Sequence, residues 1–186
     1  DHYNQAVRIF TSLNDKHFLA TLYNNIGNCF WEGEQAKVAI PIYQQSLDLF
    51  EDLYGTAPIE NAAIHYNLGN CLTKEKAYKT AHVHYEKAIE LTQQVYHANH
   101  PLLAKYKTSN GTAYQEQGDY DKALTQFEEA LAILKIELAP QQAIGFIESP
   151  IVLIDLLNAK ANTLYLLFAE TKKVTYLLES LALYEY

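Results

Sequence analysis

The stretch Asn67-Leu68-Gly69-Asn70-Cys71 recurs along the chain at a constant spacing. Asn25-Ile26-Gly27-Asn28-Cys29 lies 42 residues earlier, and Ser109-Asn110-Gly111-Thr112-Ala113 lies 42 residues later. Other small and aromatic residues keep the same spacing, namely Ala39, Ala81 and Ala123, and Tyr43, Tyr85 and Phe127. A period of this size is typical of a solenoid of stacked helical pairs. The sequence therefore predicts an all-α fold of antiparallel helix pairs.

The composition indicates a folded protein without a basic surface. The chain has 186 residues, of which 49% are hydrophobic, and only seven glycines and five prolines, so it is too apolar for disorder. Its formal net charge of −8 argues against nucleic acid and anionic membranes as partners, because both attract basic proteins. No run of eighteen apolar residues is present, so we expect no membrane span.

The start of the chain and its cysteines suggest where the protein works. Residues 1–4 are neither basic nor followed by an apolar core, so we expect no signal peptide. The chain contains no Met, and we interpret it as an internal piece of a longer protein. Cys29 and Cys71 occupy equivalent positions, too far apart for a disulfide. We expect buried thiols in a reducing compartment, and therefore a cytoplasmic protein.

Apolar periodicity and turn residues predict the order of the helices. We expect the second helix of a truncated repeat at 1–14, three helix pairs at 15–138, a linker at 139–149 and a degenerate, truncated pair at 150–186. The helices are expected at about 2–14, 16–32, 35–53, 59–74, 77–96, 101–117, 120–138, 150–170 and 174–186. Pro41 lies inside the third of these, where we expect a kink or a late helix start.

Three aligned blocks resemble the tetratricopeptide repeat. The family's order of large and small residues is matched by Tyr23, Ile26, Gly27, Phe30, Ala39, Tyr43 and Ser46, by His65, Leu68, Gly69, Leu72, Ala81, Tyr85 and Ala88, and by Lys107, Asn110, Gly111, Tyr114, Ala123, Phe127 and Ala130. Lys107 and Asn110 depart from the pattern and predict looser packing there. The resemblance implies a right-handed superhelix that binds proteins without catalysis.

Two details refine the resemblance. The family's repeat has about 34 residues, so these blocks carry roughly one extra turn per helix, as in kinesin light chains and many bacterial scaffolds. Leu156–Ala161, Leu164-Tyr165, Tyr176–Leu178 and Ala182–Tyr184 resemble the last helical pair before the peptidase domain of bacterial CHAT proteins, which are caspase-like. That resemblance implies an alternative function, as the regulatory arm of a cysteine peptidase whose catalytic domain lies beyond this chain.

The first helix of each pair lines the concave face of such a solenoid, where partners usually bind. Residues that share this face by helical spacing are Asn24, Asn25, Asn28, Trp31, Tyr66, Asn67, Asn70, Lys74, Lys105, Ser109, Thr112 and Asn162. Because a carboxamide both donates and accepts hydrogen bonds, the recurring asparagines can hold a peptide backbone without reading its sequence. The alternative is that they bond a neighbouring helix and fix the repeat spacing.

Other kinds of site find little support. Only Lys74 and Lys105 are basic among these residues, too few for a clamp on a terminal carboxylate. The seven histidines have no companions at metal-ligand spacing, and no nucleophile–base pair or phosphate loop is present. We therefore predict no catalytic residues, no metal and no cofactor. A third function class is self-association through the apolar faces of the truncated ends.

Overall fold

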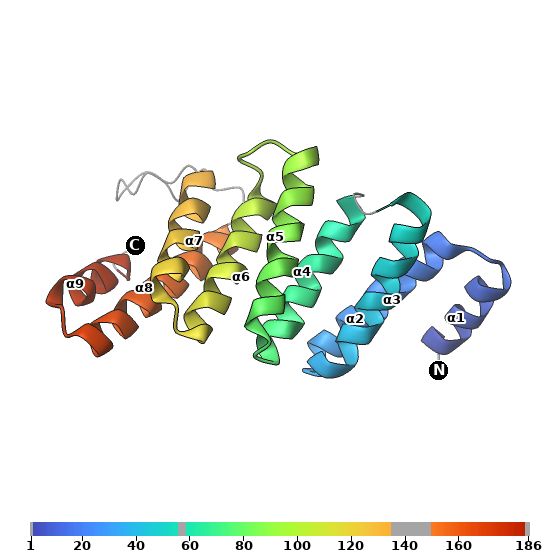
Figure 1. Ribbon diagram of the computed structural model, residues 1–186, viewed down its shortest axis with the longest axis horizontal. Helices are drawn as coiled ribbons and strands as arrows, with labels where there is room; N and C mark the ends of the chain where they lie inside the picture. The colour runs from blue at the N-terminus through green and yellow to red at the C-terminus, as the bar shows by residue number, and fades with distance from the viewer. Residues whose placement is uncertain (1, 56–58, 135–149, 185–186) are drawn as a thin grey trace. The chain divides into compact units, whose positions relative to one another are not determined.

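The computed structural model describes residues 2–55, 59–134 and 150–184. These residues form helices and no strands (Figure 1), so the all-α prediction is confirmed. The helices are α1 (His2–Ser12), α2 (Lys16–Glu32), α3 (Ala36–Tyr54), α4 (Ile59–Lys74), α5 (Tyr78–Val95), α6 (Pro101–Gln117), α7 (Tyr120–Ile133), α8 (Pro150–Thr171) and α9 (Val174–Leu183). They divide into two compact units, Asp1–Val95 and Tyr96–Tyr186.

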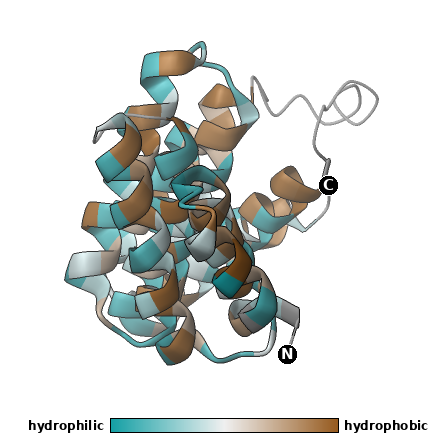
Figure 2. Cartoon of the chain, turned by 90° about the vertical axis from the view of Figure 1, so that its right-hand side faces the viewer, coloured by the Kyte–Doolittle hydropathy of each residue, from teal (hydrophilic) through white to brown (hydrophobic). Residues whose placement is uncertain are grey.

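The first unit holds α1 to α5. Helices α2 and α3 form one antiparallel pair and α4 and α5 the next, while α1 packs on α2 and α3 packs on α4. Apolar and polar residues alternate around the helices (Figure 2), because each buries only one stripe. The core of the first pair and its neighbour contains Ala20, Ala36, Ala39, Tyr43, Leu47, Phe50, Ile64, Leu68 and Cys71.

The second unit holds α6 to α9. Helix α6 pairs with α7 and α8 pairs with α9, and α8 packs against both α6 and α7. The core here contains Ala104, Ala123, Phe127, Ala130, Leu131, Leu153 and Leu156. Small alanines alternate with large side chains in both cores, which lets neighbouring helices approach closely.

The helix ends follow from local sequence. The carboxylate of Asp15 accepts a hydrogen bond from the backbone N–H of Phe18 at 3.2 Å, so this residue caps α2. Asp119 caps α7 in the same way. Gly118 ends α6 with φ at +89°, a left-handed conformation that favours glycine. Helix α3 begins at Ala36 and continues through Pro41, so a late start at the proline is wrong.

The two cysteines differ in their surroundings, contrary to expectation. Cys71 is fully buried, and burial raises the pKa of its thiol to about 12. Cys29 is exposed, although the hydroxyl of Tyr3 in α1 lies 3.2 Å from its Sγ. The prediction that both thiols are buried is therefore wrong for Cys29.

Two further expectations concern the linker and a membrane-spanning segment. The linker expected at 139–149 lies outside the described residues, and the division of the chain into four parts stays a prediction. Residues Ile151–Thr171 form a helix long and apolar enough to cross a membrane, and 33% of its apolar window of 18 residues is buried within the structure. This helix packs on three others through Leu156, Ala161 and Leu164. A core helix of a soluble protein passes the same test of length and composition.

Candidate functional site

Each repeated glycine lies under an aromatic ring of the paired helix. A Cβ atom on Gly27 would lie 2.6 Å from Cε1 of Tyr43, and one on Gly69 would lie 2.7 Å from Cε1 of Tyr85. In the second unit, a Cβ on Gly111 would lie 2.5 Å from Cε1 of Phe127. These distances leave no room for any side chain, so the recurring glycine is required by the recurring ring.

The last pair is joined by a hydrogen bond between α8 and α9. Ala161 is fully buried, and the hydroxyl of Ser180 donates to its carbonyl at 2.8 Å. In the first unit the hydroxyl of Ser46 donates to the carbonyl of Ala20 at 2.7 Å, which joins α3 to α2 by the same kind of bond.

The tyrosine rings also place their hydroxyls on the candidate groove residues. The Tyr43 hydroxyl donates to Oδ1 of Asn28 at 2.7 Å, and the Tyr85 hydroxyl donates to Oδ1 of Asn70 at 2.8 Å. Each asparagine directly follows its glycine, so the ring that covers the glycine ends beside the carboxamide. Burial raises the pKa of Tyr43 far above its usual value, which keeps the phenol neutral and able to donate.

A third asparagine joins neighbouring pairs within the first unit. Nδ2 of Asn67 donates to Oδ1 of Asn28 at 3.1 Å and to Oδ1 of Asn24 at 3.4 Å. These bonds link α4 to α2, which is the spacing role that we considered as the alternative. The contacts of Asn67 therefore join helices and at the same time bring three carboxamides together.

The other candidates of the first unit lie on the same helices as this cluster. Asn25 and Lys74 are exposed, and Trp31 has 36% of its surface exposed. The ring of Tyr66 is half-buried, with its centroid 6.2 Å from that of Tyr85. The face thus combines polar carboxamides with aromatic surface.

The second unit has a weaker polar set on its first helices. Phe127 has no hydroxyl, and the residue after the glycine is Thr112, which donates to the carbonyl of Thr108 at 3.1 Å. Ser109 is half-buried, while Lys105 and Asn162 are exposed. The tyrosine–asparagine pair of the first unit is therefore absent from α6 and α7.

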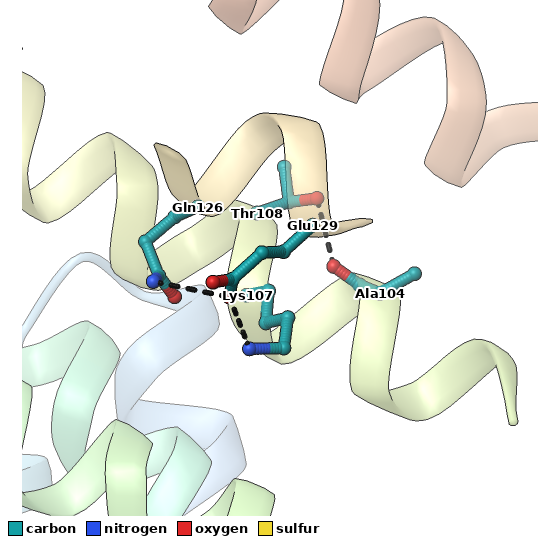
Figure 3. Close-up of polar contacts among 5 residues, drawn as sticks. All are labelled: Ala104, Lys107, Thr108, Gln126 and Glu129. Carbon is teal, nitrogen blue, oxygen red and sulfur yellow. Dashed lines mark hydrogen bonds and ion pairs between the residues drawn. The ribbon is translucent and has the colours of Figure 1, made fainter. Parts of the chain in front are cut away.

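An ion pair accommodates Lys107, one of the two residues of α6 that depart from the family pattern. The ammonium of Lys107 lies 2.6 Å from the carboxylate of Glu129, which also accepts from Gln126 at 3.5 Å (Figure 3). Only 16% of the Lys107 side chain is exposed. Charge pairing with α7 thus accommodates a lysine where the two preceding blocks have Tyr23 and His65.

Sequence reasoning missed a histidine pair between α4 and α5. Nδ1 of His65 lies 2.9 Å from Nδ1 of His84, so one ring donates and the other accepts. Burial lowers the pKa of both rings, that of His65 to about 4 with further contributions from His84 and Lys87. Within the described part of the chain, no three His, Cys, Asp or Glu side chains are grouped so that they could hold a metal ion.

Comparisons with known proteins agree with this architecture. The family model of the tetratricopeptide repeat matches residues 1–52 and 60–136. The search of curated proteins gives no significant match. Repeats of this family generally mediate protein–protein interactions and are typically non-catalytic.

Several solved structures share the fold. BtubC (BKLC) from P. vanneervenii is 24% identical over 70% of this chain and 53% of that one, with a TM-score of 0.64. Nearly identical TPR-like repeats of a Podosopora anserina protein described as a kinesin light chain are 15% identical over 97% and 83%, with a TM-score of 0.71. The N-terminal domain of C. elegans stress-induced protein-1 is 18% identical over 78% and 97%, with a TM-score of 0.54.

The present chain spans about half the length of the BtubC structure that it matches. At these identities the likeness shows the fold alone, whereas the family model covers well over half of the chain. Together with the glycine–aromatic packing of its helix pairs, that match shows that the chain belongs to the tetratricopeptide repeat family.

Proposed function

We propose that this chain is a non-catalytic scaffold that binds a peptide or partner protein through the first helices of its pairs. In a superhelix of such pairs these helices line the concave face. The observation that carries the proposal is the cluster of half-buried carboxamides on α2 and α4, held by Tyr43 and Tyr85. Polar side chains fixed in place lose little conformational entropy on binding, which favours recognition.

The remaining candidate residues would supply the rest of the contact surface. In the first unit these are Asn24, Asn25, Asn67, Lys74, Trp31 and Tyr66, and in the second Lys105, Ser109, Thr112 and Asn162. The aromatic residues Trp31 and Tyr66 would provide apolar area, which commonly dominates binding energy. The net charge of −8 favours neutral or basic partners, and the two unpaired thiols suit the cytoplasm.

Selection from a phage-displayed library of random peptides, followed by affinity measurements with variants, tests the proposal. Asn25→Ala removes an exposed carboxamide, and Asn70→Ala removes one held by a tyrosine. We expect the double variant to bind selected peptides roughly thirtyfold more weakly, because each of the two lost hydrogen bonds contributes about 1 kcal/mol. Gln45→Ala changes an exposed amide on the second helix α3 and serves as the matched control.

Equal binding by the double variant and the Gln45→Ala control, with the helical fold intact, would contradict the proposal. Failure to select any peptide would contradict peptide binding itself. Circular dichroism establishes that each variant is folded before its affinity is compared.

A second candidate function is the regulatory arm of a CHAT-type cysteine peptidase. The residues that favour it lie in α8 and α9, where Leu156–Ala161 and Ala182–Tyr184 carry the resemblance. Reading the same open reading frame beyond Tyr186 tests it. A following domain with a His and a Cys after consecutive strands would support this function, and partner-triggered proteolysis would then be assayed.

Self-association is a further candidate for the partner. Helix α9 exposes Val174, Leu178 and Leu181 along one stripe, each more than half exposed. Apolar stripes of this kind often mark contact surfaces. Sedimentation at several concentrations tests self-association, which predicts a concentration-dependent dimer that Leu178→Glu abolishes.

A further inference from the structure

The carboxamides of the first unit are fixed in orientation by their neighbours. Oδ1 of Asn28 accepts from two donors, the Tyr43 hydroxyl at 2.7 Å and Nδ2 of Asn67 at 3.1 Å. Since a carbonyl oxygen has two lone pairs, its accepting capacity is filled. The group that Asn28 retains for a ligand is therefore its NH2, a donor.

Asn67 is oriented in the opposite sense. Its Nδ2 donates both to Asn28 and to Asn24, which uses both of its N–H bonds. The group left for a ligand is Oδ1, an acceptor. Asn70 repeats the arrangement of Asn28, because its Oδ1 accepts from Tyr85 at 2.8 Å and its NH2 remains as a donor.

We propose that Tyr43 and Tyr85 are positioning residues that make this surface a donor–acceptor–donor set for the neutral amide groups of an extended peptide. The NH2 groups of Asn28 and Asn70 would donate to ligand carbonyls, and Oδ1 of Asn67 would accept from a ligand N–H. This inference rests on the proposed function and adds the ligand's chemistry to it. An extended main chain supplies both groups along one edge at every second residue.

The same set disfavours a carboxylate. Asn67 presents a carbonyl oxygen beside the NH2 of Asn28, since the two side chains are bonded at 3.1 Å. A carboxylate carries no hydrogen to meet that oxygen and would be repelled by it, whereas an amide satisfies both groups. Asparagine and glutamine side chains of a ligand carry the same amide chemistry as the main chain, so the test separates the two sources.

The experiment uses the whole protein as the target for selecting peptides from two random libraries. One library contains all residue types, and the other lacks Asn and Gln. Tyr43→Phe and Tyr85→Phe remove the positioning hydroxyls and keep the rings that cover the glycines. We expect each to bind the selected peptides about 3-fold to 10-fold more weakly, the loss typical of one neutral hydrogen bond. Tyr23→Phe is the matched control, because that half-buried tyrosine makes no hydrogen bond to any other described residue.

N-methylation of the peptide, one residue at a time, tests the acceptor. Blocking the N–H that meets Asn67 should weaken binding to the natural chain by about the same factor. With Asn67→Ala the same modification should cause no further loss, since the two changes remove one bond. If the library without Asn and Gln yields binders, the amide groups that contact the asparagines come from the peptide main chain. If only the other library yields binders, that assignment is overturned.

If the phenylalanine variants unfold, Asn28→Asp tests the same donor group by changing the asparagine itself. Asn28→Asp retains the oxygen that accepts from Tyr43 but replaces the NH2 by a second oxygen, so it should bind at least 10-fold more weakly. Gln45→Glu makes the same change of charge on α3 and is expected to bind normally.

The outcomes distinguish this inference from the proposed function. Peptides that bind the phenylalanine variants and the Tyr23→Phe control equally would overturn the positioning role and leave peptide binding standing. Peptides whose binding is abolished by amidation of their C-terminus would overturn the amide chemistry. The absence of any selected peptide would overturn peptide binding itself, and this inference with it.

Discussion

The ring of Tyr85 occupies the space that a side chain on Gly69 would need, with Cε1 2.7 Å from the position of a Cβ. The same ring carries its hydroxyl to Oδ1 of Asn70. Packing and the candidate site are therefore coupled, because the absence of a side chain at position 69 decides where the hydroxyl lies. In the two blocks of the first unit, the glycine is thus required both for helix packing and for the orientation of the next residue.

Gly69→Ala is expected to lower the free energy of unfolding by about 1 to 2 kcal/mol. Alanine is better than glycine in a helix by about 1 kcal/mol, but overpacking a core contact costs about 1 to 3 kcal/mol. Tyr85 is buried and hydrogen-bonded, so its ring has little room to move. Urea unfolding measures the change.

Gly33→Ala is the matched control for this prediction. Gly33 has φ at −78°, and its nearest atom to an added Cβ is the carbonyl oxygen of Cys29 at 3.4 Å, an ordinary contact. This variant should be neutral or more stable by up to about 1 kcal/mol. Equal effects at positions 33 and 69 would refute the role assigned to the tyrosine ring.

The glycine–aromatic contacts show what the sequence can reveal. The spacing of Gly27, Gly69 and Gly111 predicted the paired helices, because a repeat imposes the same packing on each block. The hydrogen bond between Tyr43 and Asn28 could not be predicted from the sequence, because it depends on where the Tyr43 ring lies relative to α2. Exposure of Cys29 was mispredicted for a similar reason, because α1 covers less of α2 than a full repeat would.

Asn61→Leu is expected to stabilise the protein by about 1 to 2 kcal/mol. Asn61 is fully buried, and neither atom of its carboxamide has a hydrogen-bond partner among the described residues. An unsatisfied buried polar group costs about 1 to 3 kcal/mol, and leucine has a similar volume. The equivalent residues of the neighbouring blocks are Leu19 and Leu103, so the repeat itself supports the change.

The urea midpoint of Asn61→Leu decides this prediction, and Asn61→Ala controls for the loss of volume. Alanine should destabilise relative to leucine, because it leaves a cavity. A leucine variant less stable than the natural chain would mean that a buried water satisfies Asn61.

Acidification should destabilise the first unit through the pair of His65 and His84. The pKa of His65 in the folded state is about 4, below the value of about 6.5 for an unfolded histidine. The unfolded state therefore binds more protons at intermediate pH. The stability conferred by the neutral ring is complete above pH 6.5 and is lost as the pH falls towards 4.

Unfolding in urea at pH 7.5 and at pH 5.0 measures this loss. His65 alone should account for about 2 kcal/mol between the two values, and His84 acts in the same direction because burial also lowers its pKa. The variant His65→Tyr with His84→Ile carries the residues of the preceding block, Tyr23 and Ile42. An equal pH dependence in this variant would assign the loss to other groups.

The second unit offers a way to build the tyrosine–asparagine pair where it is missing. The ring of Phe127 covers Gly111 as Tyr43 covers Gly27, and Thr112 follows that glycine. Phe127→Tyr alone should lower stability by about 1 kcal/mol, because its hydroxyl enters a fully buried site without the carboxamide acceptor. Adding Thr112→Asn should restore that stability, because the new carboxamide oxygen accepts a hydrogen bond from the new hydroxyl. Threonine and asparagine have similar helix propensities, so the second substitution should cost little by itself.

A double-mutant cycle in urea measures the coupling between these two substitutions. We expect about 1 kcal/mol of favourable coupling, the usual net contribution of a hydrogen bond. Phe127→Tyr with Thr112→Ala is the control, because alanine cannot accept. Additive effects in the cycle would mean that a tyrosine ring over Gly111 does not by itself bring its hydroxyl to residue 112. The orientation of Asn28 and Asn70 would then depend on a further contact.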